Sequence, residues 1–189
     1  MKLVKSDTAL RRSTLRFACV FAMLLVWPAP LRLFGQDRAV RVAQRGMVAS
    51  VNPIATDAGI AAMRAGGNAV DAAVATALTL GVVDGHNSGL GGGCFVLIRT
   101  SDGELIAIDG REMAPAAATR DMYVEDGKVV AGRSTTGPLA VGIPGALAAY
   151  EKALSSHGKL KLSQLLAPAA DVADRGFEVD EVYARKLKR

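Results

Sequence analysis

The sequence predicts a layered α/β fold (α+β), in which helices pack against a small β-sheet. The sheet is predicted from two apolar runs of strand length, residues 95–98 and 105–108. The turn between them, Ser101-Asp102-Gly103, contains an Asp-Gly pair, which is typical of a β-hairpin between β-branched runs. The segments on both sides of this hairpin have helical patterns, so we expect helices to pack onto it.

Two helices are predicted before the hairpin. Asn52-Pro53 is typical of a helix start, with Asn as the cap and Pro at the first helical position, and this helix is expected over residues 54–65. Gly66-Gly67 ends it, and Asn68 caps a second helix that runs to about residue 80. Asp71 lies in the first turn of the second helix, where the helix dipole favours a negative charge. Its Ala, Val, Leu and Thr content predicts burial on most sides.

The chain after the hairpin is predicted to alternate between loops and helices. The expected elements are a helical turn at 119–123, a weaker hairpin over 124–130 around Asp126-Gly127, a loop over 134–145, a helix from Pro144 to about 155, a helix capped by Ser163 through 173, and a helix over 180–187. No repeats or low-complexity tracts divide the chain, which predicts one unit after the leader.

Residues 1–36 are predicted to be a secretory signal peptide. Basic residues precede an uncharged apolar run of eleven residues, 17–27, which ends at Pro28-Ala29-Pro30. This run is shorter than the about 20 residues that a membrane-spanning helix needs. The alternative is an uncleaved membrane anchor. We therefore expect residues 37–189 to be exported, into the periplasm or the medium, without a stable membrane span.

The net positive charge of the chain comes from residues 1–36. Residues 1–36 carry six Lys and Arg against one Asp, a net charge of +5, which equals the net charge of the whole chain. Residues 37–189 are therefore neutral overall. This balance argues against nucleic acid as a partner, because a nucleic-acid-binding domain usually carries a basic patch.

Residues 86–94, His-Asn-Ser-Gly-Leu-Gly-Gly-Gly-Cys, connect the second helix to the hairpin. A phosphate-binding glycine loop follows a strand and opens a helix, and here the order is reversed, which argues against nucleotide binding. Cys94 is predicted to be a small buried thiol and not a nucleophile. His86 is expected to be a solvated loop residue, although it could line a site. His86 and His157 are the only histidines and lie far apart, so neither a metal site nor a cofactor is expected.

Several motifs in this order resemble the large subunit of the γ-glutamyltranspeptidase (glutathione hydrolase) family. They are Gly46-Met47-Val48-Ala49-Ser50, Ala65-Gly66-Gly67-Asn68-Ala69-Val70-Asp71-Ala72-Ala73, Asn87-Ser88-Gly89-Leu90-Gly91-Gly92-Gly93, Ile108-Asp109-Gly110-Arg111-Glu112-Met113-Ala114-Pro115-Ala116 and Gly142-Ile143-Pro144-Gly145. The resemblance covers about residues 45–185 and implies an N-terminal nucleophile hydrolase with an αββα sandwich. Residues 37–189 would be the N-terminal part of its large subunit, so the sandwich would be partial and incomplete in this chain.

Arg111 is the candidate substrate-binding residue. It follows a predicted strand end, between Asp109 and Glu112. Taken locally, it either pairs with one of these carboxylates or offers its guanidinium to a substrate carboxylate, which a lysine cannot bind in the same bidentate way. The resemblance implies the second role, with this arginine holding the α-carboxylate of a γ-glutamyl group.

The resemblance also implies a reaction and a partner. In the family, a precursor cleaves itself before a threonine that opens the small subunit and attacks the γ-glutamyl carbonyl, with its own α-amine as base. Thr135-Thr136 is rejected as this nucleophile, because Gly137-Pro138 follow it. We expect no catalytic residue in this chain, an inactive isolated chain, glutathione as a substrate, and a small subunit as heterodimer partner. Three alternatives stay open: a β-lactam side-chain acylase, a poly-γ-glutamate-processing enzyme, or a non-catalytic fragment or binding module.

Overall fold

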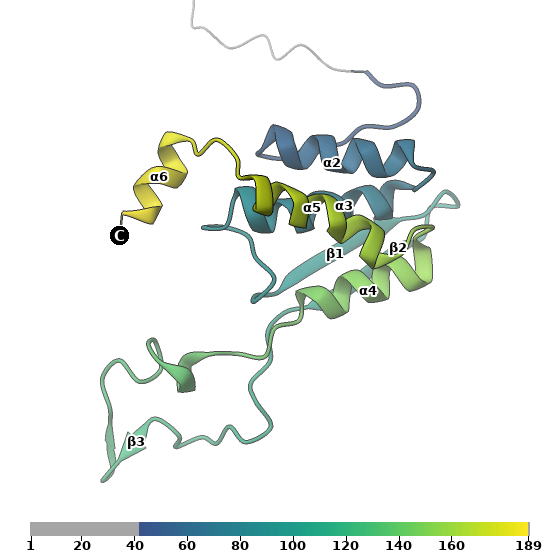
Figure 1. Cartoon of the computed structure of the whole chain (residues 1–189). Coiled ribbons are helices and arrows are strands. Elements are labelled where there is room, and N and C mark those ends of the chain that lie inside the picture. Colours follow the sequence, from purple (N-terminus) through teal and green to yellow (C-terminus); the bar gives the residue numbers. More distant parts are fainter. Residues whose placement is uncertain (1–41, 189) are drawn as a thin grey trace, which may run out of the picture. The chain divides into compact units, whose positions relative to one another are not determined.

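The computed structural model describes residues 42–188 (Figure 1). The predicted signal peptide, residues 1–36, and Cys19 within it lie outside the described residues. All described residues except Val42 belong to one unit, Ala43–Arg189. None of the helices in the described part of the chain combines the length and apolarity that crossing a membrane would require.

The predicted hairpin is formed by strands β1 (Cys94–Arg99) and β2 (Leu105–Gly110), which pair antiparallel with Leu97 opposite Ala107. Gly103 in the turn has a φ of +93°, which explains the glycine of the Asp-Gly pair. Side chains alternate along both strands, as the period of two requires. Val96, Ile98, Ile106 and Ile108 are half-buried, and the opposite face is exposed.

Both helices predicted before the hairpin form. Helix α2 (Pro53–Arg64) is capped by Asn52, whose Oδ1 accepts the N–H of Ile54 at 2.9 Å. Helix α3 (Ala69–Val83) is capped by Asn68 in a reciprocal capping box with Asp71. It runs three residues further than predicted, because the apolar pattern continues to Val83, which is buried.

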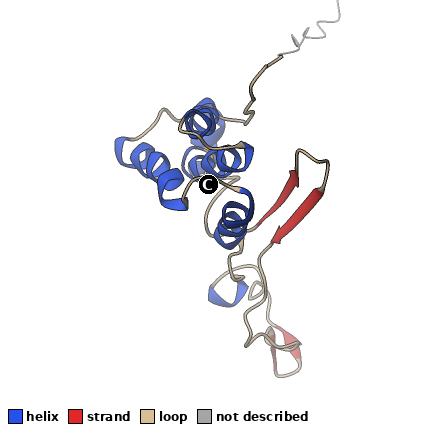
Figure 2. Ribbon diagram, turned by 90° about the vertical axis from the view of Figure 1, so that its right-hand side faces the viewer, coloured by secondary structure: helices blue, strands red, loops and turns tan. Residues whose placement is uncertain are grey.

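Helix α3 lies at the centre of the helical layer. It packs against α2, against α4 (Ala146–His157) and against α5 (Leu162–Arg175). The prediction that α3 is buried on most sides is confirmed. Its close approach to α2 requires a glycine, because a Cβ at Gly59 would collide with the hydroxyl oxygen of Thr76. Figure 2 shows these helices on one side of the β1–β2 hairpin, with α4 next to the strands.

Two helix starts differ from the prediction. Helix α4 begins at Ala146, after Gly145, and not at Pro144. Ser163 does not cap α5, which begins at Leu162 with Lys161 as its N-cap, two residues earlier than predicted. The N–H of Lys161 donates to Oε1 of Gln164 at 2.9 Å. The two residues before Lys161 are held by a side chain of helix α3: the carboxylate of Asp71 accepts the N–H groups of Lys159 and Leu160. A tertiary contact therefore sets where α5 begins.

The segment between β2 and α4 contains only short elements. The weak hairpin is formed by β3 (Val124–Glu125) and β4 (Lys128–Val129), with positive φ at Asp126 and Gly127. The predicted helical turn at 119–123 is a pair of hydrogen-bonded turns. The predicted loop over 134–145 contains a 3-10 helix, η1 (Pro138–Ala140). Near the end of the chain, α6 (Glu181–Leu187) is capped by Asp180.

Candidate functional site: Arg111 beside a glycine-lined cavity

Arg111 lines a cavity of about 570 Å³ together with the segment that connects α3 to β1. One wall consists of this connection, and the other contains the end of β2 and part of α4. The lining residues are Ala77, Leu80, Gly85, His86, Asn87, Ser88, Gly89, Gly91, Gly92, Gly93, Cys94, Arg111, Glu112 and Tyr150. Most of one wall is therefore backbone, which offers N–H and C=O groups to a polar ligand.

Three of the motifs that are separate in the sequence meet at this cavity. The N–H groups of Gly145 and Ala146, at the start of α4, donate to the carbonyl oxygen of Gly92 at 3.1 and 3.2 Å. A Cβ at Gly93 would lie 2.7 Å from the carbonyl oxygen of Gly110. Met113 and Ile143 form an antiparallel bridge. The glycines permit backbone contacts that a side chain would block.

The guanidinium of Arg111 has a nearby acidic partner but remains accessible. Its Nη1 lies 3.0 Å from Oε2 of Glu112, and the Arg111 side chain is 55% exposed. Asp109 forms no ion pair with the guanidinium, and its Oδ1 accepts the backbone N–H of Arg111 at 2.9 Å. The local ion pair that the sequence left open therefore exists with Glu112. An exposed pair of this kind contributes about 0–1 kcal/mol, so it leaves the guanidinium free to bind a carboxylate ligand.

Cys94 lines this cavity, is half-buried and packs against the main hydrophobic cluster. The thiol that the sequence predicts to be buried is therefore only half-buried, since β1 begins at the cavity wall. Burial raises the pKa of the Cys94 thiol, against a smaller opposing effect of its hydrogen bond with Tyr150. Burial also raises the pKa of Tyr150. A thiol with a raised pKa carries less thiolate at neutral pH, which agrees with a packing residue.

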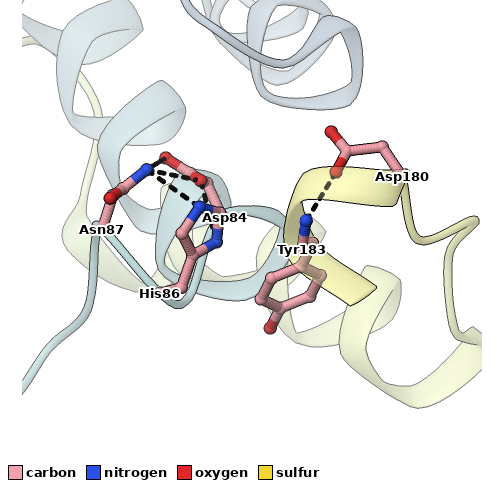
Figure 3. A network of polar contacts seen from close by, with 5 residues as sticks. All are labelled: Asp84, His86, Asn87, Asp180 and Tyr183. Atoms are coloured by element: carbon pink, nitrogen blue, oxygen red, sulfur yellow. Dashed lines mark hydrogen bonds and ion pairs between the residues drawn. The ribbon is translucent and has the colours of Figure 1, made fainter. Parts of the chain in front are cut away.

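His86 differs from the prediction. It is not a solvated loop residue: its side chain is only 13% exposed. The cause is a long-range contact, because the ring of Tyr183 in α6 lies 5.2 Å from the imidazole, centroid to centroid. Figure 3 shows His86 between Tyr183 and the pair Asp84 and Asn87. No local pattern could reveal this burial, because its cover comes from the far end of the chain.

Thr135 and Thr136 lie away from the cavity. Both are exposed in a turn whose amides donate to the carbonyl oxygen of Gly132, and neither lines the cavity. Within residues 42–188, no cluster of three or more His, Cys, Asp or Glu residues could hold a metal ion. Tyr150 is a lining residue that the sequence did not indicate, because it lies within the apolar pattern of α4.

Comparison with known proteins identifies relatives of this chain. The family profile described as Gamma-glutamyltranspeptidase matches residues 55–189. The glutathione hydrolase proenzyme of Escherichia coli (strain K12) is 44% identical over 165 residues, which cover 85% of this chain and 28% of that protein. The chain thus spans about a quarter of the length of the curated relatives that it matches.

Solved structures show the same fold. The crystal structure of Helicobacter pylori gamma-glutamyltranspeptidase matches with a TM-score of 0.74 and 39% identity, over 79% of this chain and 43% of that one. Cephalosporin acylase from Bacillus halodurans matches with a TM-score of 0.66 and 30% identity, over 82% of this chain and 30% of that one. These matches confirm the predicted α/β fold class and the partial sandwich. With the family profile over most of its length, the chain belongs to the γ-glutamyltranspeptidase family.

Proposed function

We propose that the complete protein is a γ-glutamyltransferase and glutathione hydrolase. It cleaves γ-glutamyl amides such as glutathione and transfers the γ-glutamyl group to water or to an amino acid through an acyl-threonine. The observation that carries this proposal is the accessible guanidinium of Arg111 beside a cavity walled by glycine backbone. A guanidinium fork binds a carboxylate through two parallel N–H···O contacts, which would hold the α-carboxylate of the glutamyl group.

The remaining parts of the reaction belong to the rest of the protein. The threonine hydroxyl attacks the γ-carbonyl carbon, its α-amine takes the proton, and the amine of the leaving group departs. Water or an amino acid then attacks the ester and releases the threonine. The small subunit that carries this threonine would be the heterodimer partner of the present chain, and export through residues 1–36 would place the enzyme in the periplasm or the medium.

The complete protein is expected to cleave a γ-glutamyl anilide and glutathione and to leave a glutaryl anilide intact. The glutaryl compound keeps the terminal carboxylate and lacks only the α-amine. Release of the aniline from both compounds, followed by absorbance, tests the assignment. Turnover of the glutaryl anilide without turnover of the γ-glutamyl anilide would overturn it and favour a β-lactam side-chain acylase, the alternative that the similarity to a cephalosporin acylase supports. A poly-γ-glutamate-processing enzyme would instead prefer a γ-glutamyl oligomer over glutathione.

A second function, of a different class, is a non-catalytic binding module. The outer face of the β1–β2 hairpin supports it, because Phe95, Leu97 and Leu105 are 68%, 81% and 76% exposed. An exposed apolar sheet face is typical of a surface that another layer covers.

Residues 37–189 expressed alone are therefore expected to aggregate and to show no hydrolase activity. The reason is the exposed sheet face, since apolar faces and unpaired strand edges associate with one another. Light scattering of the isolated chain measures this, and Leu97→Lys should lower the scattering. Lys128→Leu in the exposed strand β4 serves as a control that should not lower it. A soluble, cooperatively melting monomer would contradict the fragment interpretation and favour the binding module.

A further inference from the structure

The glycine-rich wall of the Arg111 cavity has few side chains that could hold it in place. Ideal Cβ positions at Gly89 and Gly91 meet no heavy atom within 4 Å. Glycine also restricts its own backbone less than any other residue does. The geometry of this wall must therefore be set at its two ends.

The C-terminal end is held by the backbone of α4. The N–H groups of Gly145 and Ala146 donate to the carbonyl oxygen of Gly92, and Gly93 packs against the backbone of Gly110. These contacts continue directly into β1. Because the contacts involve only main-chain atoms, this end is fixed by the fold itself.

The N-terminal end is held by a turn centred on Asp84. The carbonyl oxygen of Asp84 accepts the N–H groups of Asn87 and Ser88, both at 2.9 Å. Its carboxylate accepts from Nδ2 of Asn87 at 3.2 Å. Asp84 is also the C-cap of α3, where the helix dipole disfavours a negative charge. A nearby donor or cation would therefore stabilise this turn.

His86 lies against both polar side chains of this turn. Its Nδ1 lies 3.4 Å from Oδ1 of Asp84, and its Nε2 lies 3.1 Å from Nδ2 of Asn87 (Figure 3). Because an amide nitrogen only donates, Nε2 accepts the hydrogen bond from Asn87. Nδ1 is buried and forms no hydrogen bond within the described part of the chain, so the imidazole is held by the contact of Nε2 with Asn87 and by its surroundings.

Those surroundings are provided by α6. Tyr183 covers the imidazole, its ring stacks on Phe177 at 5.9 Å, and its N–H donates to Oδ1 of Asp180 at 2.7 Å. His86 lines the Arg111 cavity and also a cavity of about 180 Å³ against α6, whereas Tyr183 lines only the second of these two. His86 therefore lies between α6 and the glycine wall.

We propose that His86 is a positioning residue for the γ-glutamyl site: with Asp84, and covered by Tyr183, it fixes the start of the glycine wall opposite Arg111. This inference rests on the proposed function, because the ligand that the wall receives is the γ-glutamyl group. His86 takes no part in bond making or breaking. Its effect is on how well the cavity is preorganised for the substrate carboxylate.

His86→Ala in the complete protein is expected to raise KM for a γ-glutamyl anilide about tenfold, below the ~100-fold that a 1 Å misplacement can cost. The value of kcat should change less than about twofold, since the chemical step does not involve the imidazole. His86→Gln keeps an acceptor for Asn87 and should restore most of the affinity. Tyr183→Ala should raise KM similarly, and the double variant should equal the single ones, because both act on one turn. His157→Ala, at the end of α4, is the matched control and should leave KM unchanged.

Hydrogen exchange at Asn87 and Ser88 gives a second measurement that needs no activity. Their amide exchange should accelerate in His86→Ala and Tyr183→Ala and remain at the wild-type rate in His157→Ala. Wild-type KM and wild-type exchange in His86→Ala would overturn the proposal, and so would a lower melting temperature with KM unchanged. If the wild-type protein cleaves no γ-glutamyl donor, the proposed function fails, while the exchange rates still decide whether His86 holds this turn.

Discussion

Arg111→Lys is expected to raise KM of the complete protein for γ-glutamyl donors by about thirtyfold or more, a loss of at least ~2 kcal/mol. A single ammonium cannot replace two parallel N–H···O contacts to a carboxylate. The loss of the pair with Glu112 contributes little to this effect, because the Arg111 side chain is 55% exposed. Initial rates with a γ-glutamyl anilide measure KM and kcat separately, and the defect should lie chiefly in KM.

Two comparisons make this result specific. A 4-aminobutanoyl anilide lacks only the α-carboxylate, so its turnover should be nearly the same in the variant and the wild type. Arg99→Lys, at the exposed end of β1, is the matched control and should leave KM unchanged. Cleavage into two subunits should survive in Arg111→Lys, since it needs no substrate carboxylate. Wild-type KM for glutathione in this variant would show that Arg111 is only a structural partner of Glu112.

Asp71→Ala is expected to lower the free energy of unfolding by about 3–5 kcal/mol, a large effect for one substitution. Asp71 is fully buried, and its carboxylate accepts three backbone N–H groups, those of Asn68, Lys159 and Leu160, at 2.7 to 3.1 Å. Removing it leaves these donors without their acceptor at the junction of α3 with the α4–α5 loop. Urea unfolding of the complete protein, followed by circular dichroism, measures the change.

Asp57→Ala in α2 provides the control for this prediction, because Asp57 is exposed and lies on the outside of its helix. It should change stability by no more than about 0.5 kcal/mol. Asp71→Asn, which keeps one acceptor oxygen, should fall between the two. Equal stability of Asp71→Ala and Asp57→Ala would mean that water replaces the carboxylate and that the α4–α5 loop does not depend on it.

Of the candidate site, the sequence alone identified Arg111. Its place at a strand end and its motif identified it as the residue to test. The same pattern could not decide between a local ion pair and a ligand, because both need the same residue types at the same spacing. The structure shows the pair with Glu112 and the cavity beside it, and the cavity depends on α4 and the glycine wall lying against the end of β2.

The sequence by itself determined α2, α3 and the β1–β2 hairpin, because their caps, glycines and alternating side chains act within a few residues. Only the tertiary structure decided where α5 begins and that the His86 side chain is largely shielded from solvent. Asp71 fixes the backbone before α5, and Tyr183 covers His86, from positions that are distant in the sequence. Such contacts form only when the helices pack, and they leave no periodic pattern in the residues that they hold.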